Sequence, residues 1–168
     1  FDDRYLLEVN GRYDGSSRFP SDERWAFFPS ASVGWRISQE PWWNVKSEHI
    51  SNAKVRFSWG SLGNAAGLSN YQYIQTLGIS KSDYILDGLR QNYMSSPAAL
   101  PGNLTWETAT TYDIGVDLGF FDNRLTVSGD YYIRKTTDMI VNGPTVPDVF
   151  GASSPKGNYA DMSTYGYE

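Results

Sequence analysis

The sequence predicts an all-β fold built from antiparallel up-and-down strands. Apolar and polar residues alternate with a period of two along most of the 168 residues, and a helical period is almost absent. Two alternating segments, 104–121 and 124–138, flank the short turn Asp122-Asn123, which is typical of a β-hairpin. Both segments are far longer than the usual strand of about 5–6 residues. Strands of this length favour a barrel with tilted strands.

The composition excludes several classes of function. The net charge of −5 offers no basic excess for binding nucleic acid, and the 15% of aromatic residues argue against disorder. With no Cys and a single His, His49, the chain lacks the ligands of the common zinc sites and a thiol nucleophile. We therefore expect no catalytic residue, no metal and no cofactor. No run of 18 apolar residues is present, but a membrane-spanning strand needs only about 9–11 alternating residues.

The remaining strands follow from the same alternation. In the first of these strands, the apolar residues Tyr5, Leu7 and Val9 point to one face, and the polar residues Arg4, Glu8 and Asn10 point to the other. Turn residues such as Gly, Pro, Asn and Asp separate the segments. We predict strands at 4–14, 25–38, 52–61, 104–121 and 124–138, with weaker patterns at 71–79, 84–93 and 158–164.

The predicted hairpin has two unlike faces. One face carries apolar residues such as Val116 with the aromatic residues Trp106, Tyr112, Phe120 and Tyr131. The other carries four charged residues among small ones: Asp113, Asp117, Asp130 and Arg134. In an outer-membrane barrel the apolar face meets lipid and the polar face lines a wet lumen, whereas in a soluble β-sandwich the apolar face is the core. The alternation alone fits both, and a small closed barrel of eight strands is a third alternative.

Ordered sequence motifs point to one family. They run through most of the chain, from Tyr5-Leu6-Leu7-Glu8-Val9-Asn10 onward, and the stretch 80–101 matches least. The others are Arg12-Tyr13-Asp14-Gly15-Ser16-Ser17-Arg18-Phe19, Arg24-Trp25, Phe28-Pro29-Ser30, Gly34-Trp35-Arg36-Ile37, Arg56-Phe57-Ser58-Trp59-Gly60, Leu62-Gly63-Asn64, Leu104-Thr105-Trp106-Glu107-Thr108, Ile114-Gly115-Val116-Asp117-Leu118-Gly119, Asn123-Arg124-Leu125, Asp130-Tyr131-Tyr132 and Thr137-Asp138-Met139. In this order they resemble the SusC/RagA-type TonB-dependent outer-membrane transporters.

The resemblance implies a function that the residues alone do not show. Such transporters form barrels of about 22 strands around an N-terminal plug. They import glycans or peptides across the outer membrane of Gram-negative bacteria with energy passed on by TonB, and a SusD-like surface lipoprotein closes over them. Residues 1–168 would be a segment of the barrel, with the plug, the TonB box and the C-terminal strand outside it. The partners implied are therefore the lipoprotein, TonB, the nutrient and membrane lipid, and the chain is not an enzyme.

The tight turn at Asp122-Asn123 orients the strands, because short turns are periplasmic in such barrels. Counting strands from it places 15–24, 139–157 and both ends of 62–103 on the extracellular side and 39–51 on the periplasmic side. The span 62–103 then holds either one large loop with its own hairpin or an extra pair of strands. We expect an open-edged curved sheet rather than a closed small barrel.

Candidate site residues fall into two groups. Aromatic residues of the loops, which stack on sugars and anchor interfaces, are candidates for ligand or lid contact, with mutual packing of the loops as the alternative. They are Phe19, Trp25, Tyr71, Tyr73 and Tyr93. Four charged residues are expected to face the lumen, with Arg134 and Arg12 balancing the carboxylates: Asp113, Asp117, Asp130 and Arg134.

Three further expectations concern single features. Asp113 and Asp117 lie about 13 Å apart along a strand at about 3.3 Å per residue. A glycosidase pair needs about 5–10 Å, so these carboxylates do not form one. His49 is expected in a solvated turn, and Trp42 and Trp43 are expected to anchor the periplasmic rim in the membrane.

Overall fold

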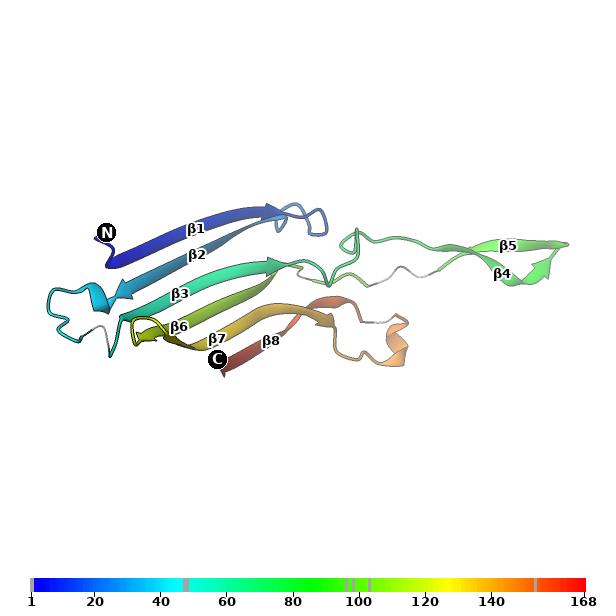
Figure 1. The fold of residues 1–168 in the computed structure, drawn as a ribbon. Helices are drawn as coiled ribbons and strands as arrows, with labels where there is room; N and C mark the ends of the chain where they lie inside the picture. The colour runs from blue at the N-terminus through cyan, green and yellow to red at the C-terminus, as the bar shows by residue number, and fades with distance from the viewer. Residues whose placement is uncertain (1, 47–48, 96, 98, 103, 153) are drawn as a thin grey trace.

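The computed structural model describes residues 2–46, 49–95, 97, 99–102, 104–152 and 154–168. Within these residues six strands form one antiparallel sheet in the order β1-β2-β3-β6-β7-β8, and two more form a separate hairpin (Figure 1). The sheet strands are β1 (Tyr5–Gly15), β2 (Trp25–Arg36), β3 (Asn52–Asn64), β6 (Glu107–Phe120), β7 (Leu125–Asn142) and β8 (Lys156–Tyr167), the hairpin is β4 (Ile79–Leu86) with β5 (Leu89–Met94), and the short 3-10 turns are η1 (Ile37–Gln39) and η2 (Asp148–Phe150).

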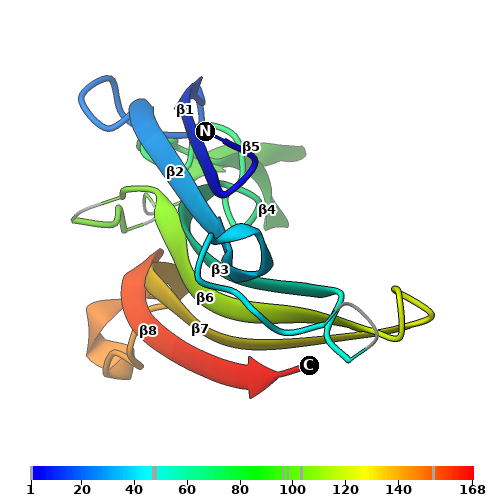
Figure 2. The same cartoon turned by 60° about the vertical axis from the view of Figure 1, so that its left-hand side comes forward.

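The predicted fold class is confirmed. Each strand of the sheet pairs antiparallel with its neighbour, and the sheet is curved, as Figure 2 shows. β1 and β8 form the two edges of the described sheet and do not pair with each other, so the expected open edges are found and the small closed barrel is not. Among the described residues no helix is long and apolar enough to span a membrane.

The ends of the sheet agree with the strand count made from the turn. Residues 16–24, the β3–β6 connection and the β7–β8 connection all leave from one end, which we call the loop end (Figure 1). Residues 37–46 and the turn 121–124 lie at the opposite, turn end. β3 pairs directly with β6, so the span 62–103 is one large connection with its own hairpin.

Two predicted elements need correction. Residues 71–78 form no strand, and the predicted strand 84–93 is interrupted by the turn Asp87-Gly88, whose φ angles are 51° and 76°. An Asp-Gly pair with positive φ at both residues is the typical two-residue hairpin turn, a signal present in the sequence. At the hairpin of β6 and β7 the turn has four residues, 121–124, because Phe120 pairs with Leu125. Three of these four residues have positive φ angles: Phe121, Asp122 and Asn123.

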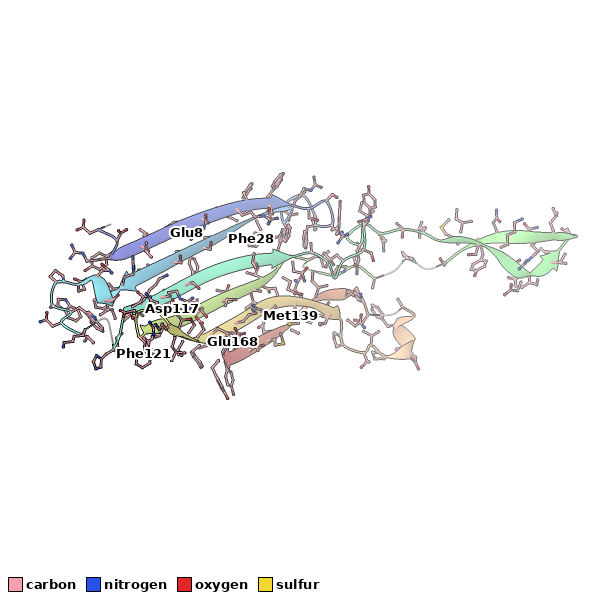
Figure 3. The ribbon with its side chains drawn as sticks, viewed as in Figure 1. Glu8, Phe28, Asp117, Phe121, Met139 and Glu168 are labelled. Atoms are coloured by element: carbon pink, nitrogen blue, oxygen red, sulfur yellow. The ribbon has the colours of Figure 1, made fainter. Side chains whose placement is uncertain are left out.

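The two faces of the sheet differ as the alternation predicts. One row across the strands aligns Val9, Ala31, Trp59, Tyr112 and Ile133. The neighbouring row consists of Glu8, Ser32, Ser58, Asp113 and Tyr132. Side chains project from both faces (Figure 3), and no second sheet among the described residues covers the apolar one. Leu7 and Val9 are 74% and 70% exposed. A soluble sandwich would bury them.

Apart from Ala53 near the start of β3, the buried apolar residues of the described chain gather at the loop end. They are Phe19, Phe28, Leu68, Leu104 and Trp106, which we call the loop cluster. Trp106, which the alternation assigns to the apolar face of a strand beginning at 104, lies in this cluster because β6 begins only at Glu107. The pairing of β2 with β3 ends at Ser30 and Gly60, so Phe28 of the loop cluster lies beyond the last paired residues.

Candidate functional site

The polar face holds a three-residue ion network at its centre. Arg56 of β3 donates from Nε to Asp117 Oδ2 at 2.8 Å and from Nη2 to Asp130 Oδ1 at 2.9 Å. Ser128 Oγ donates to the other oxygen of Asp117 at 2.9 Å. The guanidinium lies over Gly115, where a Cβ would be 2.8 Å from Nη2 and would overlap Asp130 Oδ1. Glycine at this position therefore makes room for the network.

The four charged residues predicted to face the lumen share this face. Register places Asp113 opposite Ser58 and Arg134 opposite Thr111, in the same rows as the polar side chains of β1 and β2. The predicted source of the balancing charge is wrong, however. Arg134 Nε donates to Thr111 Oγ1 at 3.2 Å, and Arg12 pairs with Asp14 at 2.7 Å.

Arg56 is therefore the residue of the polar face whose role as the shared cation the sequence analysis missed. The alternation places Arg56 on the polar face of its strand, but the sequence around Arg56 does not show which other strand pairs with β3. The long β3–β6 connection separates Arg56 from Asp117 in sequence, while pairing of Val55 with Val116 brings them together. A signal was nevertheless present, because a cation on the polar face of a long strand needs a partner on a neighbouring strand.

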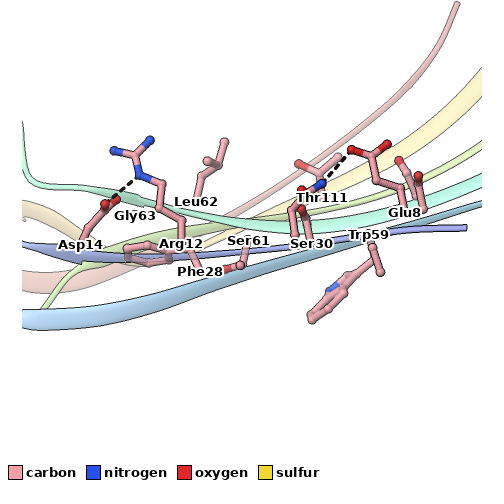
Figure 4. Close-up of a pocket in the computed structure, with 16 residues that line it drawn as sticks. Glu8, Arg12, Asp14, Phe28, Ser30, Trp59, Ser61, Leu62, Gly63 and Thr111 are labelled. Carbon is pink, nitrogen blue, oxygen red and sulfur yellow. Dashed lines mark hydrogen bonds and ion pairs between the residues drawn. The ribbon is translucent and has the colours of Figure 1, made fainter.

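Two adjoining hollows lie along the polar face toward β1. Their volumes are about 580 Å³ and about 540 Å³, and Glu8, Ser32 and Ser58 line both. The larger hollow brings hydroxyl, amide and carboxylate groups together with apolar side chains such as Phe28 and Leu62, and the Arg12–Asp14 pair lies at one end (Figure 4). Such groups bind ligands rich in hydroxyl or peptide groups through hydrogen bonds.

The predicted aromatic candidates occupy three environments. Phe19 is 0% exposed and packs on Trp106 at 4.8 Å between ring centroids, so it contacts other loop residues. Tyr73 packs against the same loop cluster. Trp25 stacks on Tyr13 at 5.3 Å on the apolar face, as strand residues.

Tyr71 and Tyr93 belong to the long β3–β6 connection. They are 64% and 52% exposed, and Tyr93 lies on β5. Of the five aromatic candidates, these two are therefore the ones that lie in the loop region and present an open ring. Their ligand or lid contact remains a proposal.

A second polar cluster lies at the turn end. The buried carboxylate of Glu40 accepts hydrogen bonds at Oε1 from the Tyr5 hydroxyl at 2.6 Å and the Trp35 indole at 2.9 Å. Arg4 lies 3.6 Å from Oε2. Because these donors favour the charged form, the hydrogen bond from Tyr5 first and that from Trp35 next, the pKa of Glu40 is below its usual range.

Exposed aromatic residues continue from this cluster. Trp42 is 59% exposed and packs edge-on against Trp35, with centroids 6.5 Å apart, and Trp43 packs on Trp42 in the same way.

His49 lies in an exposed turn, where its backbone N–H donates to the Lys46 carbonyl at 3.0 Å.

Comparison with known proteins agrees with this geometry. Residues 1–168 match the family described as TonB dependent receptor-like, beta-barrel. The chain is 35% identical to TonB-dependent receptor SusC of Bacteroides thetaiotaomicron and 36% identical to TonB-dependent receptor P3 of Formosa agariphila, in each case over 98% of the chain and 16% of the relative's length. The solved structure of the RagAB peptide transporter superposes with a TM-score of 0.81 and 28% identity over 99% of this chain and 18% of that one. These relatives are receptors and transporters rather than enzymes.

Proposed function

Because the chain belongs to the TonB-dependent receptor-like β-barrel family, we propose that it forms part of the barrel wall of an outer-membrane importer in a Gram-negative bacterium. The apolar face of the sheet contacts lipid, and the polar face lines the lumen through which a glycan or peptide nutrient passes. The chain spans 16% of the length of the curated relatives, so the plug and the part that contacts TonB belong to other segments of the protein.

The observation that carries the proposal is the uncovered apolar face with aromatic residues at both of its ends. Tyr5 and Trp35 pair at the turn end, and Tyr13 stacks on Trp25 at the loop end. From Tyr5 to Tyr13 the strand advances about 26 Å. That matches the apolar band of roughly 25 Å, flanked by aromatic girdles, of outer-membrane barrels. In this reading Trp42 and Trp43 anchor the periplasmic rim.

The substrate class follows from the polar face and the relatives. The hollows along Glu8, Ser32 and Ser58 combine hydroxyl and carboxylate groups with apolar side chains, and Lys54 and Arg56 add positive charge to the second one. Nutrients that combine hydrogen-bonding groups with apolar surface, such as glycans and peptides, suit this mixed lining. One structural neighbour is described as a peptide transporter, which supports the same class. A SusD-like lipoprotein as lid, and Tyr71 and Tyr93 as its contacts or as ligand contacts, complete the proposal.

Single-thiol labelling of the full-length protein tests which face meets lipid. Val116 and Asp117 are neighbours in β6 that face opposite sides, and the chain has no Cys of its own. A water-soluble thiol reagent should label Asp117→Cys through the lumen, whereas Val116→Cys should be protected when the protein is in lipid or detergent. If Val116→Cys is equally protected in plain buffer, in a monodisperse soluble protein, the transporter proposal is wrong and the sandwich alternative stands.

A further inference from the structure

The hairpin β4–β5 depends on its connections for its position. It forms no ladder with the six-stranded sheet and projects beyond the loop end (Figure 1). A two-stranded hairpin alone is marginally stable at best in water. We call the described residues of 65–102 the arm. The contacts at the two ends of the arm therefore decide whether it holds one direction relative to the sheet.

The outgoing end of the arm is fixed by packing and one hydrogen bond. Leu68 is 5% exposed within the loop cluster. Arg18 Nη1 donates to the Ala65 carbonyl at 3.0 Å, which ties this end to the β1–β2 connection. The Cα of Gly67 is so close to Ile140 of β7 that an added Cβ would lie 3.4 Å from it. The outgoing end thus rests on the β1–β2 connection and on β7.

The returning end is held by the side chain of Asn158 on β8. Its Oδ1 accepts from the backbone N–H of Thr105 at 3.0 Å, and its Nδ2 donates to the carbonyl of Thr105 at 2.9 Å. One carboxamide thus satisfies both backbone groups of a residue outside the sheet, as a neighbouring strand would. Its Nδ2 also donates to the carbonyl of Asp138, at the irregularity where the β7–β8 register shifts.

A second anchor holds the same residues from the opposite side. Thr105 Oγ1 donates to Glu23 Oε2 at 3.1 Å, and the Trp106 indole donates to the Glu23 carbonyl at 3.1 Å. Leu104 and Trp106 are 3% and 9% exposed, so they lie packed in the loop cluster on either side of Thr105. Residues 104–106 are therefore tied to β8 and to the β1–β2 connection at once.

We propose that Asn158 and Glu23 form a clamp on residues 104–106 that sets the direction of the arm relative to the barrel wall. Asn158 is the main positioning residue, since it supplies both hydrogen bonds to the Thr105 backbone. The ladder position of Asn158 opposite Ile140 depends on backbone pairing and not on its carboxamide, so we expect β8 to keep its place in the wall when the side chain is removed. The proposal goes beyond the import function and holds whatever the barrel carries.

Distance measurement between two spin labels tests the clamp in the full-length protein, with any cysteine outside this chain replaced. One label goes on Gly102→Cys, where an added Cβ meets no atom within 4 Å, and the other on Arg124→Cys in the exposed turn at the far end of the sheet. The parent and Asn10→Ala should give one narrow distance distribution. Asn10 is the matched control, because its amide donates to Glu8 on β1, away from the arm. Asn158→Ala should add distances that the parent lacks.

Hydrogen exchange separates loss of the clamp from loss of the fold. In Asn158→Ala the Thr105 amide should exchange at least about fivefold faster, the effect of one lost hydrogen bond, while the slow amides of β6 and β7 keep their rates. Glu23→Ala, which changes no strand of the sheet, should broaden the Gly102 distances in the same direction but less. The proposal is overturned if both variants keep the narrow distribution, or if the β6 and β7 amides of Asn158→Ala exchange as fast as that of Thr105.

Discussion

The sheet and the arm expose apolar side chains in different ways. In the sheet the exposed residues, such as Leu7 and Val9, lie in rows on one face, while polar residues occupy the other. In the hairpin both members of the pair Leu86–Leu89 are exposed, and so is the adjacent Ile85, whose side chain points the other way. One-sided exposure indicates a surface between two solvents, lipid and water. Exposure of apolar residues on both faces does not distinguish a lipid side from a water side, so the arm gives no evidence about the position of the membrane.

The two regions also differ in how their geometry is determined. β3 and β6 pair without interruption from Asn52–Gly119 to Asn64–Glu107, whereas β4 and β5 have a register shift between Lys81 and Ile85. Each of the four inner strands of the described sheet has a neighbour on both sides, but each strand of the hairpin has one. We therefore expect equivalent substitutions to have large effects in the sheet and loop cluster and small effects in the arm.

The largest contrast should come from the loop cluster. Trp106→Ala removes a buried side chain that packs on Phe19 and Phe28, and such truncations cost about 3–5 kcal/mol. Tyr84→Ala on the arm, where the ring is 71% exposed, should change stability by less than about 0.5 kcal/mol. Urea unfolding of the full-length protein in phospholipid vesicles measures both. Equal effects would show that the arm is packed as firmly as the cluster.

The apolar face gives the next largest contrast. Val116→Arg places a charge on the lipid side of β6 and should cost about 2–4 kcal/mol near the middle of the bilayer. Ile85→Arg on the hairpin should leave assembly unchanged, although Ile85 is more exposed than Val116, at 68% against 40%. Heat-modifiable migration of outer-membrane fractions on gels reports assembly. Normal assembly of Val116→Arg would contradict a lipid-facing surface.

The sequence predicted more of the sheet than of the loop cluster and the arm. The alternation located the sheet strands and their faces, because residues 5–15 and 107–120 meet two unlike environments along their whole length. It could not show that β3 lies beside β6, nor that Phe19 and Leu104 are buried, since these facts depend on contacts between distant segments. In the arm the alternation is weak, and the strand predicted at 84–93 ran through the turn at Asp87-Gly88.

Charged residues allow the same comparison of the sheet with the arm, because each region contains an arginine that pairs with aspartate. Arg56→Met leaves Asp117 and Asp130 as neighbouring carboxylates without their shared cation, and should destabilise the protein by about 1–2 kcal/mol given their partial exposure. Arg90→Met on the arm removes an exposed pair with Asp83 and one hydrogen bond to the Ser82 carbonyl, and should cost less than about 1 kcal/mol. Adding Asp130→Asn to Arg56→Met should restore part of the loss in urea unfolding. No recovery would mean that Arg56 acts through packing rather than charge.

The smallest expected effect concerns pH at the turn end. The hydrogen bonds from Tyr5 and Trp35 hold the pKa of Glu40 below its ordinary value, so the folded protein binds the proton less readily than the unfolded chain does. A carboxyl group with a lowered folded pKa stabilises the fold above its ordinary pKa of about 4.3, and this contribution disappears as the pH falls through the lowered value. Glu40→Gln has no such titration but keeps an oxygen that accepts from Tyr5. The parent should therefore be more stable than Glu40→Gln at neutral pH, and the difference between their urea midpoints should shrink from about pH 5 downward. A difference that stays constant across this range, or grows toward acid, would show that the Glu40 carboxylate does not stabilise the turn end.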